Sequence, residues 1–215
     1  TTNTDLANDP GNLLSRTAAR TEKYLGGRRP DGCRSCAAPE SFDAELTGVV
    51  SALPERYASA MESYAMHKAL DEVFKVIQRA NKYIDENAPW ALAKDMEANG
   101  ARLAHVLYNL LETARICGVL LSPFMPESCG KLFDQIGAGD SLRTWDSAVF
   151  GSMPEGLKVS KGENLFPRID MEKGLAELEA AEAAAKKAAL PDVEFEPQLT
   201  ENVDFDTFCK SDFRV

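Results

Sequence analysis

Apolar residues along this 215-residue chain recur mainly at intervals of three and four, which is the period of one face of an α-helix. The widest apolar stripe falls within residues 101–121 and predicts the most regular helix of the chain. The same spacing predicts helices over 3–25, 43–87 and 127–136, and a short helical turn over 88–94. We therefore expect the N-terminal part of the chain to form a bundle of about five helices joined by short connections.

Proline and capping residues refine this pattern. Pro54 predicts either a kink or a first-turn position inside the 43–87 stretch. We therefore expect two helices in that stretch, with their joint between residues 54 and 66. Ser41 or Asp43 is expected to cap the first of them.

The C-terminal part of the chain has a different character. Residues 138–170 hold irregular apolar clusters interrupted by glycine and proline, and a short strand or two is expected there. Residues 171–202 begin as an Ala/Glu/Lys helical spacer and continue as an acidic linker. Residues 203–215 start a new apolar alternation that the chain does not complete. The predicted fold class is mainly α: a helical bundle over 1–137, then an irregular segment, a spacer and the start of a truncated β-domain.

Charge limits the classes of function. The chain has 24 Lys and Arg against 34 Asp and Glu, a net charge of −10, so it is a poor candidate for non-specific nucleic-acid binding. Residues 1–35 are the exception, because they carry six basic and four acidic residues. A specific, local nucleic-acid site is therefore expected in this stretch if the chain has one.

The apolar runs, the N-terminus and the cysteines indicate in which cellular compartment the chain is expected. No apolar run approaches the roughly 20 residues of a membrane-spanning helix, and the chain begins with no secretory leader. Five cysteines form an odd, sparse set, which favours free thiols in a reducing, cytoplasmic compartment. Because the chain lacks an initiator Met, we expect it to be a piece of a longer protein.

A row of polar side chains follows one face of the first predicted helix. Asn8, Asn12 and Arg16 stand at i, i+4 and i+8, with Asp5 just ahead of them. Amides donate and accept hydrogen bonds at once and arginine offers a fixed fork of donors, so this row is suited to the edge of an unstacked base. A solvated helix face is the alternative, and for an arbitrary polar stripe it is the commoner one.

Two residues near the end of the second predicted helical stretch complete this candidate site. Trp90 follows a proline at a chain corner, where its ring could stack on a flipped-out base or could simply pack at the corner. Asp85 could accept hydrogen bonds from a base or cap local backbone.

Metal and catalytic motifs are weak or missing. Cys33 and Cys36 have the spacing of half a zinc knuckle, but no second pair accompanies them, so no metal site is predicted. The sequence shows no glycine-rich phosphate loop, nucleophile elbow or metal-binding histidine pair, and therefore no catalytic residue is predicted.

Several segments together resemble the C-terminal portion of bacterial methionyl-tRNA synthetases. They are residues 3–17 with Asn-Leu-Leu-Ser-Arg, 81–94 with Ala-Pro-Trp, 103–126 ending in Ser-Pro-Phe-Met-Pro, 165–170 and 204–215. The resemblance runs in register over nearly the whole chain. It implies an anticodon-binding helical bundle of the class I synthetase type over 1–137, a segment closing the core enzyme over 138–170, and the opening of an appended tRNA-binding OB-fold domain at 203–215.

The resemblance also implies roles for the residues singled out above. Asn8, Asn12 and Arg16 would contact the CAU anticodon of tRNA(Met), Trp90 would stack on its first base and Asp85 would support that contact. ATP with magnesium, and zinc, are expected only in a catalytic part that this chain lacks, so the chain alone should be inactive. Any homodimer is expected only through the missing C-terminal domain.

Two other interpretations of the sequence stay open. The chain could be the equivalent domain of another class I aminoacyl-tRNA synthetase, which would keep the helices and read a different anticodon. It could also be a helical protein-interaction module whose spacer tethers a partner-binding tail.

Overall fold

A computed structural model describes residues 10–27, 40–154 and 156–166, together with residues 175, 178–182 and 185. The chain divides into two units, residues 1–169 and 170–215. The described residues of the second unit are helical, in the stretch where the sequence predicts the spacer. The predicted β-domain start at 203–215 lies outside the described residues, and the finer division of the chain stays a prediction.

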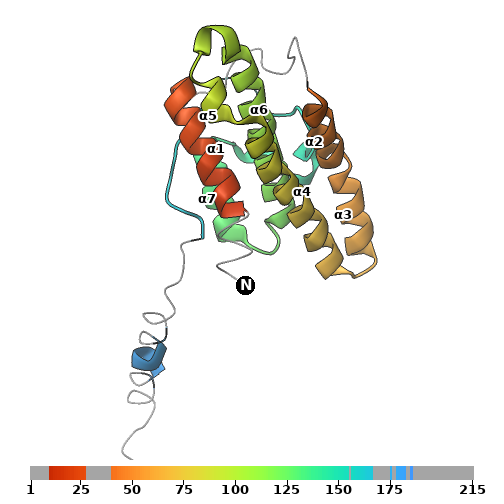
Figure 1. Ribbon diagram of the computed structural model, residues 1–215. Coiled ribbons are helices and arrows are strands. Elements are labelled where there is room, and N and C mark those ends of the chain that lie inside the picture. The colour runs from red at the N-terminus through yellow and green to blue at the C-terminus, as the bar shows by residue number, and fades with distance from the viewer. Residues whose placement is uncertain are drawn as a thin grey trace, which may run out of the picture. The chain divides into compact units, whose positions relative to one another are not determined.

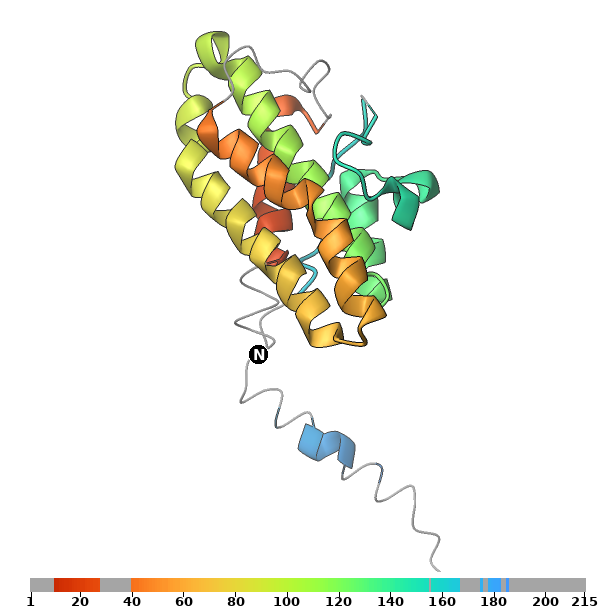
Figure 2. The same cartoon turned by 90° about the vertical axis from the view of Figure 1, so that its right-hand side faces the viewer.

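The described part of the first unit is helical throughout its core, as Figures 1 and 2 show from two sides. Its helices and two 3₁₀ turns follow in the order α1 (Pro10–Leu25), α2 (Ser41–Ser51), α3 (Leu53–Glu62), α4 (Met66–Asn87), α5 (Pro89–Leu92), α6 (Met96–Leu121), α7 (Pro126–Ile136), η2 (Asp140–Leu142) and η3 (Trp145–Ser147). The mainly α fold class is therefore confirmed. Within the described residues of 138–166 there is no strand, so the expectation of a short strand or two there is not met.

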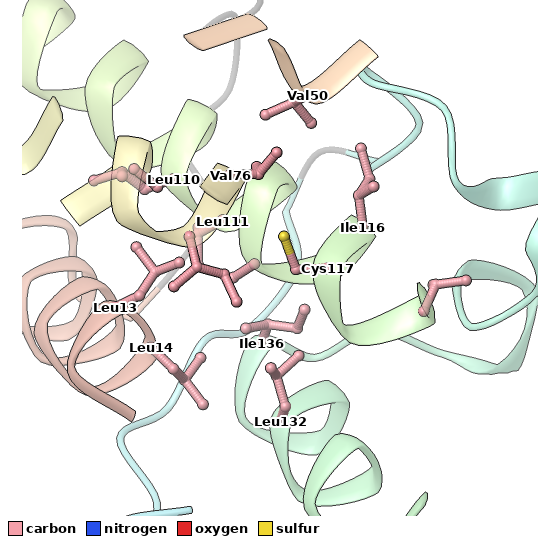
Figure 3. Close-up of a cluster of buried hydrophobic side chains, with 14 of the residues drawn as sticks. Leu13, Leu14, Val50, Val76, Leu110, Leu111, Ile116, Cys117, Leu132 and Ile136 are labelled. Carbon is pink, nitrogen blue, oxygen red and sulfur yellow. The ribbon is translucent and has the colours of Figure 1, made fainter. Parts of the chain in front are cut away.

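Helix α6 is the centre of the bundle. Every residue from Leu103 to Leu121 is buried, because α1, α2, α4, α5 and α7 all pack against this helix. Figure 3 shows how leucines from α1 and α7 point toward the apolar side chains of α6. Although α6 is long, no helix in the described part of the chain is both long and apolar enough to cross a membrane.

Local chemistry explains where the helices begin, and it corrects three expectations. The N-cap of α2 is Glu40 rather than Ser41 or Asp43, and its backbone N–H donates to the Asp43 side chain over 2.8 Å in a capping box. The 43–87 stretch contains three helices instead of two, because Pro54 lies in the first turn of a separate helix α3. Helix α6 begins at Met96, earlier than predicted, because Asp95 accepts a hydrogen bond from the Ala98 N–H over 3.1 Å.

A buried ion pair holds the irregular segment on the bundle. Arg115 and Glu112 of α6 are fully buried and joined over 2.7 Å. The Arg115 guanidinium also donates to the carbonyls of Ser147 and Val149, at 2.7 and 3.0 Å, and Glu112 accepts the Met153 N–H over 2.7 Å. Residues 138–154 therefore belong to the same packed body as the helices.

Candidate nucleic-acid interface

Helix α1 turns one face into the core and leaves a second face with two arginines. Its buried positions repeat with helical spacing and comprise Leu13, Leu14, Thr17, Ala18 and Thr21. Arg16 and Arg20 lie one turn apart and are both partly exposed. Of the other residues predicted for this face, Asn8 lies outside the described residues and Asn12 is described only as part of the α1 backbone.

Asp85 and Trp90 come from a sharp corner between α4 and α5. Ala88 ends α4 in the left-handed conformation, at φ +40°, which costs about 1–2 kcal/mol for a residue with a Cβ atom. Pro89 then starts α5, where its fixed φ suits the first helical position. The corner keeps Trp90 out of the core, and 43% of this residue remains exposed.

A buried polar network fixes this corner. Arg102 of α6 donates to both Asp43 of α2 and the Asn87 side-chain oxygen. Tyr83 donates its hydroxyl hydrogen to Asp43 and accepts from the Asn109 amide over 3.1 Å. Because α2, α4 and α6 all contribute to the network, they determine the conformation of the last turn of α4 and the strained residue that follows it.

Two contacts join α1 to the α4–α5 corner, one from Arg16 to Asp85 and one from Arg20 to Trp90. Arg16 and Asp85 form an ion pair over 3.0 Å, with side chains 36% and 64% exposed. The guanidinium carbon of Arg20 lies over the Trp90 ring, 5.2 Å from its centroid. We call Arg16, Arg20, Asp85 and Trp90 the arginine–tryptophan cluster.

Sequence reasoning missed Arg20 as a member of this cluster. The signal was present, because Arg20 extends the i, i+4, i+8 row of Asn8, Asn12 and Arg16 by one more turn. Burial of Arg20 and the nearby charge of Arg16 lower the pKa of its guanidinium, against the opposing effects of Tyr24 and Asp85. Arginine stays protonated at neutral pH all the same.

No group of three or more His, Cys, Asp or Glu side chains that could hold a metal ion occurs among the residues that the structure describes. Cys33 and Cys36 lie outside them. Cys117 and Cys129 are buried free thiols, and burial raises the pKa of these thiols to about 12 and about 11. Such thiols are unreactive at neutral pH.

Unpaired bases stack on aromatic rings and on arginine guanidinium groups, so the cluster places this helical bundle in the class of candidate single-stranded nucleic-acid binders. Residues 30–186 match the family described as the anticodon binding domain of methionyl tRNA ligase. The chain belongs to this family. The match includes Asp85 and Trp90 and begins after Arg16 and Arg20.

Relatives extend the similarity to almost the whole chain. The methionine–tRNA ligase of Caldanaerobacter subterraneus subsp. tengcongensis is 44% identical over 213 residues, which are 99% of this chain and 32% of that protein. The methionine–tRNA ligase of Bacillus subtilis is 41% identical over 218 residues, with the same coverage. The chain therefore spans about a third of the length of these relatives.

Solved structures agree with this placement. The apo form of the Mycobacterium tuberculosis methionyl-tRNA synthetase matches with a TM-score of 0.72 and 35% identity, over 79% of this chain and 33% of that one. The same enzyme bound by methionyl-adenylate matches with a TM-score of 0.70 over 77% of this chain. The chain thus corresponds to the anticodon-binding region of these methionine–tRNA ligases.

Proposed function

We propose that this chain recognises the CAU anticodon loop of tRNA(Met) for a ligase that attaches methionine to that tRNA with ATP in translation. The observation that carries the proposal is the arginine–tryptophan cluster, in which α1 and the α4–α5 corner meet within a member of an anticodon-binding family. An unpaired anticodon loop offers bases that can stack on an aromatic ring and expose their edges to hydrogen bonding.

Each residue of the site has a proposed role. Trp90 stacks on the first anticodon base, and its 43% exposure supports this role. Arg16, together with Asn8 and Asn12, reads base edges. Asp85 supports the contact by holding the Arg16 guanidinium, which offers five donors and uses one of its nitrogens in the 3.0 Å bond. The ion pair is exposed and therefore weak, so exchanging it for base contacts costs little.

In this proposal the chemical steps of the reaction take place in another part of the enzyme. ATP with magnesium, and zinc, would be bound by the part of the enzyme that corresponds to the two thirds of the relatives' length outside this chain. This chain alone would be inactive. A homodimer would form only through an appended C-terminal domain. The compartment would be the cytoplasm, where free thiols such as Cys117 persist.

Binding of a CAU anticodon stem-loop to single-residue variants tests the proposal. Trp90→Ala should weaken binding about 5- to 150-fold, because base–aromatic stacking contributes roughly 1–3 kcal/mol per base. Trp145→Ala is the matched control. Trp145, in η3, is also half-exposed, but it lies beside Tyr57 of α3, with ring centroids 6.0 Å apart. Equal affinities for the parent chain and Trp90→Ala would favour a protein-interaction module instead.

A further inference from the structure

Arg20 occupies a special position in the arginine–tryptophan cluster. It lies one turn after Arg16 on α1, and its guanidinium covers the Trp90 ring at 5.2 Å from the centroid. We propose that Arg20 is a positioning residue, which holds the Trp90 indole in the orientation that receives the first anticodon base. This inference rests on the proposed function and adds to it a residue that acts through Trp90 rather than on the RNA.

The bonding of the two arginines differs, and the difference supports separate roles. Arg16 is held by Asp85 over 3.0 Å, whereas Arg20 makes no ion pair with the residues that the structure describes. One nitrogen of Arg20, Nη1, is buried and has no hydrogen-bond partner there. Burying a guanidinium nitrogen without a partner is unfavourable, and the contact with the Trp90 ring contributes, together with the nearby Asp85 charge, to offsetting that cost.

The same contact acts on the ring. Trp90 belongs to a single short helical turn, and nearly half of the residue is exposed, so packing alone leaves its side chain room to turn. A guanidinium against one face restricts that motion and leaves the opposite face for a base. A ring that is already ordered loses less conformational entropy when the base stacks, which raises affinity without a new contact to the RNA.

The first experiment measures Trp90 in the absence of RNA. In a Trp145→Phe background Trp90 is the only tryptophan of the chain, so its fluorescence anisotropy and its quenching by acrylamide report on this ring alone. Arg20→Ala should lower the anisotropy and increase the quenching, and Arg20→Lys should restore part of both. Lys23→Ala is the matched control, because it removes a cation from another ring on α1, Tyr24, at 5.3 Å.

The second experiment is a double-mutant cycle with a fluorescently labelled CAU stem-loop. Arg20→Ala should weaken binding roughly 3- to 10-fold when Trp90 is present, and should have no further effect in a Trp90→Ala background. An equal loss in both backgrounds would overturn the inference, because Arg20 would then contact the RNA directly. Circular dichroism checks that each variant is folded, and Arg20→Lys replaces Arg20→Ala if the latter is not.

The two experiments separate this inference from the proposed function. If the parent chain binds CAU and depends on Trp90, but Arg20→Ala leaves the Trp90 anisotropy unchanged, the positioning role is wrong and the proposed function stands. If no stem-loop binds the parent chain, the proposed function is wrong, and with it the role of Arg20 in RNA binding.

Discussion

Asp43 accepts hydrogen bonds from three groups at once: the Tyr83 hydroxyl, the Arg102 guanidinium and the backbone N–H of Glu40. Burial by itself would raise the pKa of this carboxyl, but the hydrogen bonds and the Arg102 charge outweigh burial and lower the pKa below its ordinary value of 3.8. A carboxylate with a lowered pKa stabilises the fold above its unfolded-state pKa. That contribution is lost as the pH falls through the folded-state value.

Asp43→Asn should therefore change both the stability and its pH dependence. At neutral pH the free energy of unfolding should fall by about 3 kcal/mol, because the largely buried Arg102 charge loses its nearest carboxylate and keeps only the more distant, exposed Glu40 at 3.7 Å among the described ion pairs. Below about pH 4 the stability of the variant should decline less steeply than that of the parent chain. Urea unfolding at a series of pH values measures both effects. Asp140→Asn, at a fully exposed carboxylate, is the control. If the free energy of unfolding of Asp43→Asn falls with decreasing pH as steeply as that of the parent chain, the account is contradicted.

For single residues, the sequence predicts which side chains share one helix face better than it predicts which side chains contact each other across helices. Arg16, Asp85 and Trp90 were recognisable from spacing, from a proline corner and from the family resemblance. The Asp43–Arg102 contact joins residues 59 positions apart, and no local pattern indicates it. The spacing indicates that Arg20 shares a helix face with Arg16, but not that it contacts Trp90, because Trp90 lies on another helix.

At the scale of elements, a backbone segment ties the ends of two helices together. The Val159 N–H donates to the Gly27 carbonyl over 2.7 Å, after the end of α1, and the Ser160 N–H donates to Gln135 in α7 over 2.8 Å. Gly137, which ends α7 at φ +70°, has no room for a side chain, since an added Cβ atom would lie 2.3 Å from the Lys158 carbonyl oxygen. The position therefore requires glycine both for its conformation and for space.

Gly137→Ala should lower the free energy of unfolding by about 2–3 kcal/mol, because the left-handed conformation and the close approach both become unfavourable. Gly130→Ala in the same helix is the control. A Cβ atom there meets nothing within 4 Å, so the variant should be stabilised by up to about 1 kcal/mol. Thermal and urea unfolding of both variants check this difference. Similar stabilities for the two would show that the segment after α7 does not pack as described.

The sequence predicts the helices well and their junctions less well. The long stripe of α6 is evident from residue 101 onward, but the start of the helix at Met96 is not, because its cap at Asp95 lies ahead of the apolar stripe. Pro54 is compatible with either a kink or a first-turn position, because the two give the same local pattern, and the structure shows the first-turn position in α3. Neither junction involves a residue of the candidate site.

At the scale of the whole molecule, the net charge favours binding RNA through its bases over binding it through its phosphates. The chain carries −10, so attraction to the phosphate backbone contributes little, and the proposed site depends on stacking and on base edges. Phosphate contacts set the affinity and its salt dependence, whereas base contacts set the preference for one sequence. A preference that persists as salt is raised is therefore the signature of an anticodon reader.

The most direct test is a titration of the chain with two anticodon stem-loops, one carrying CAU and one with only the first base changed, at low and at moderate salt. The account predicts that CAU binds more tightly, that it alone quenches Trp90 in the Trp145→Phe background, and that the ratio of the two affinities stays the same at both salt concentrations. Equal affinities, or a ratio that disappears as salt is raised, would contradict anticodon recognition by the arginine–tryptophan cluster. Tighter binding of the changed loop would contradict the proposed preference for the CAU anticodon.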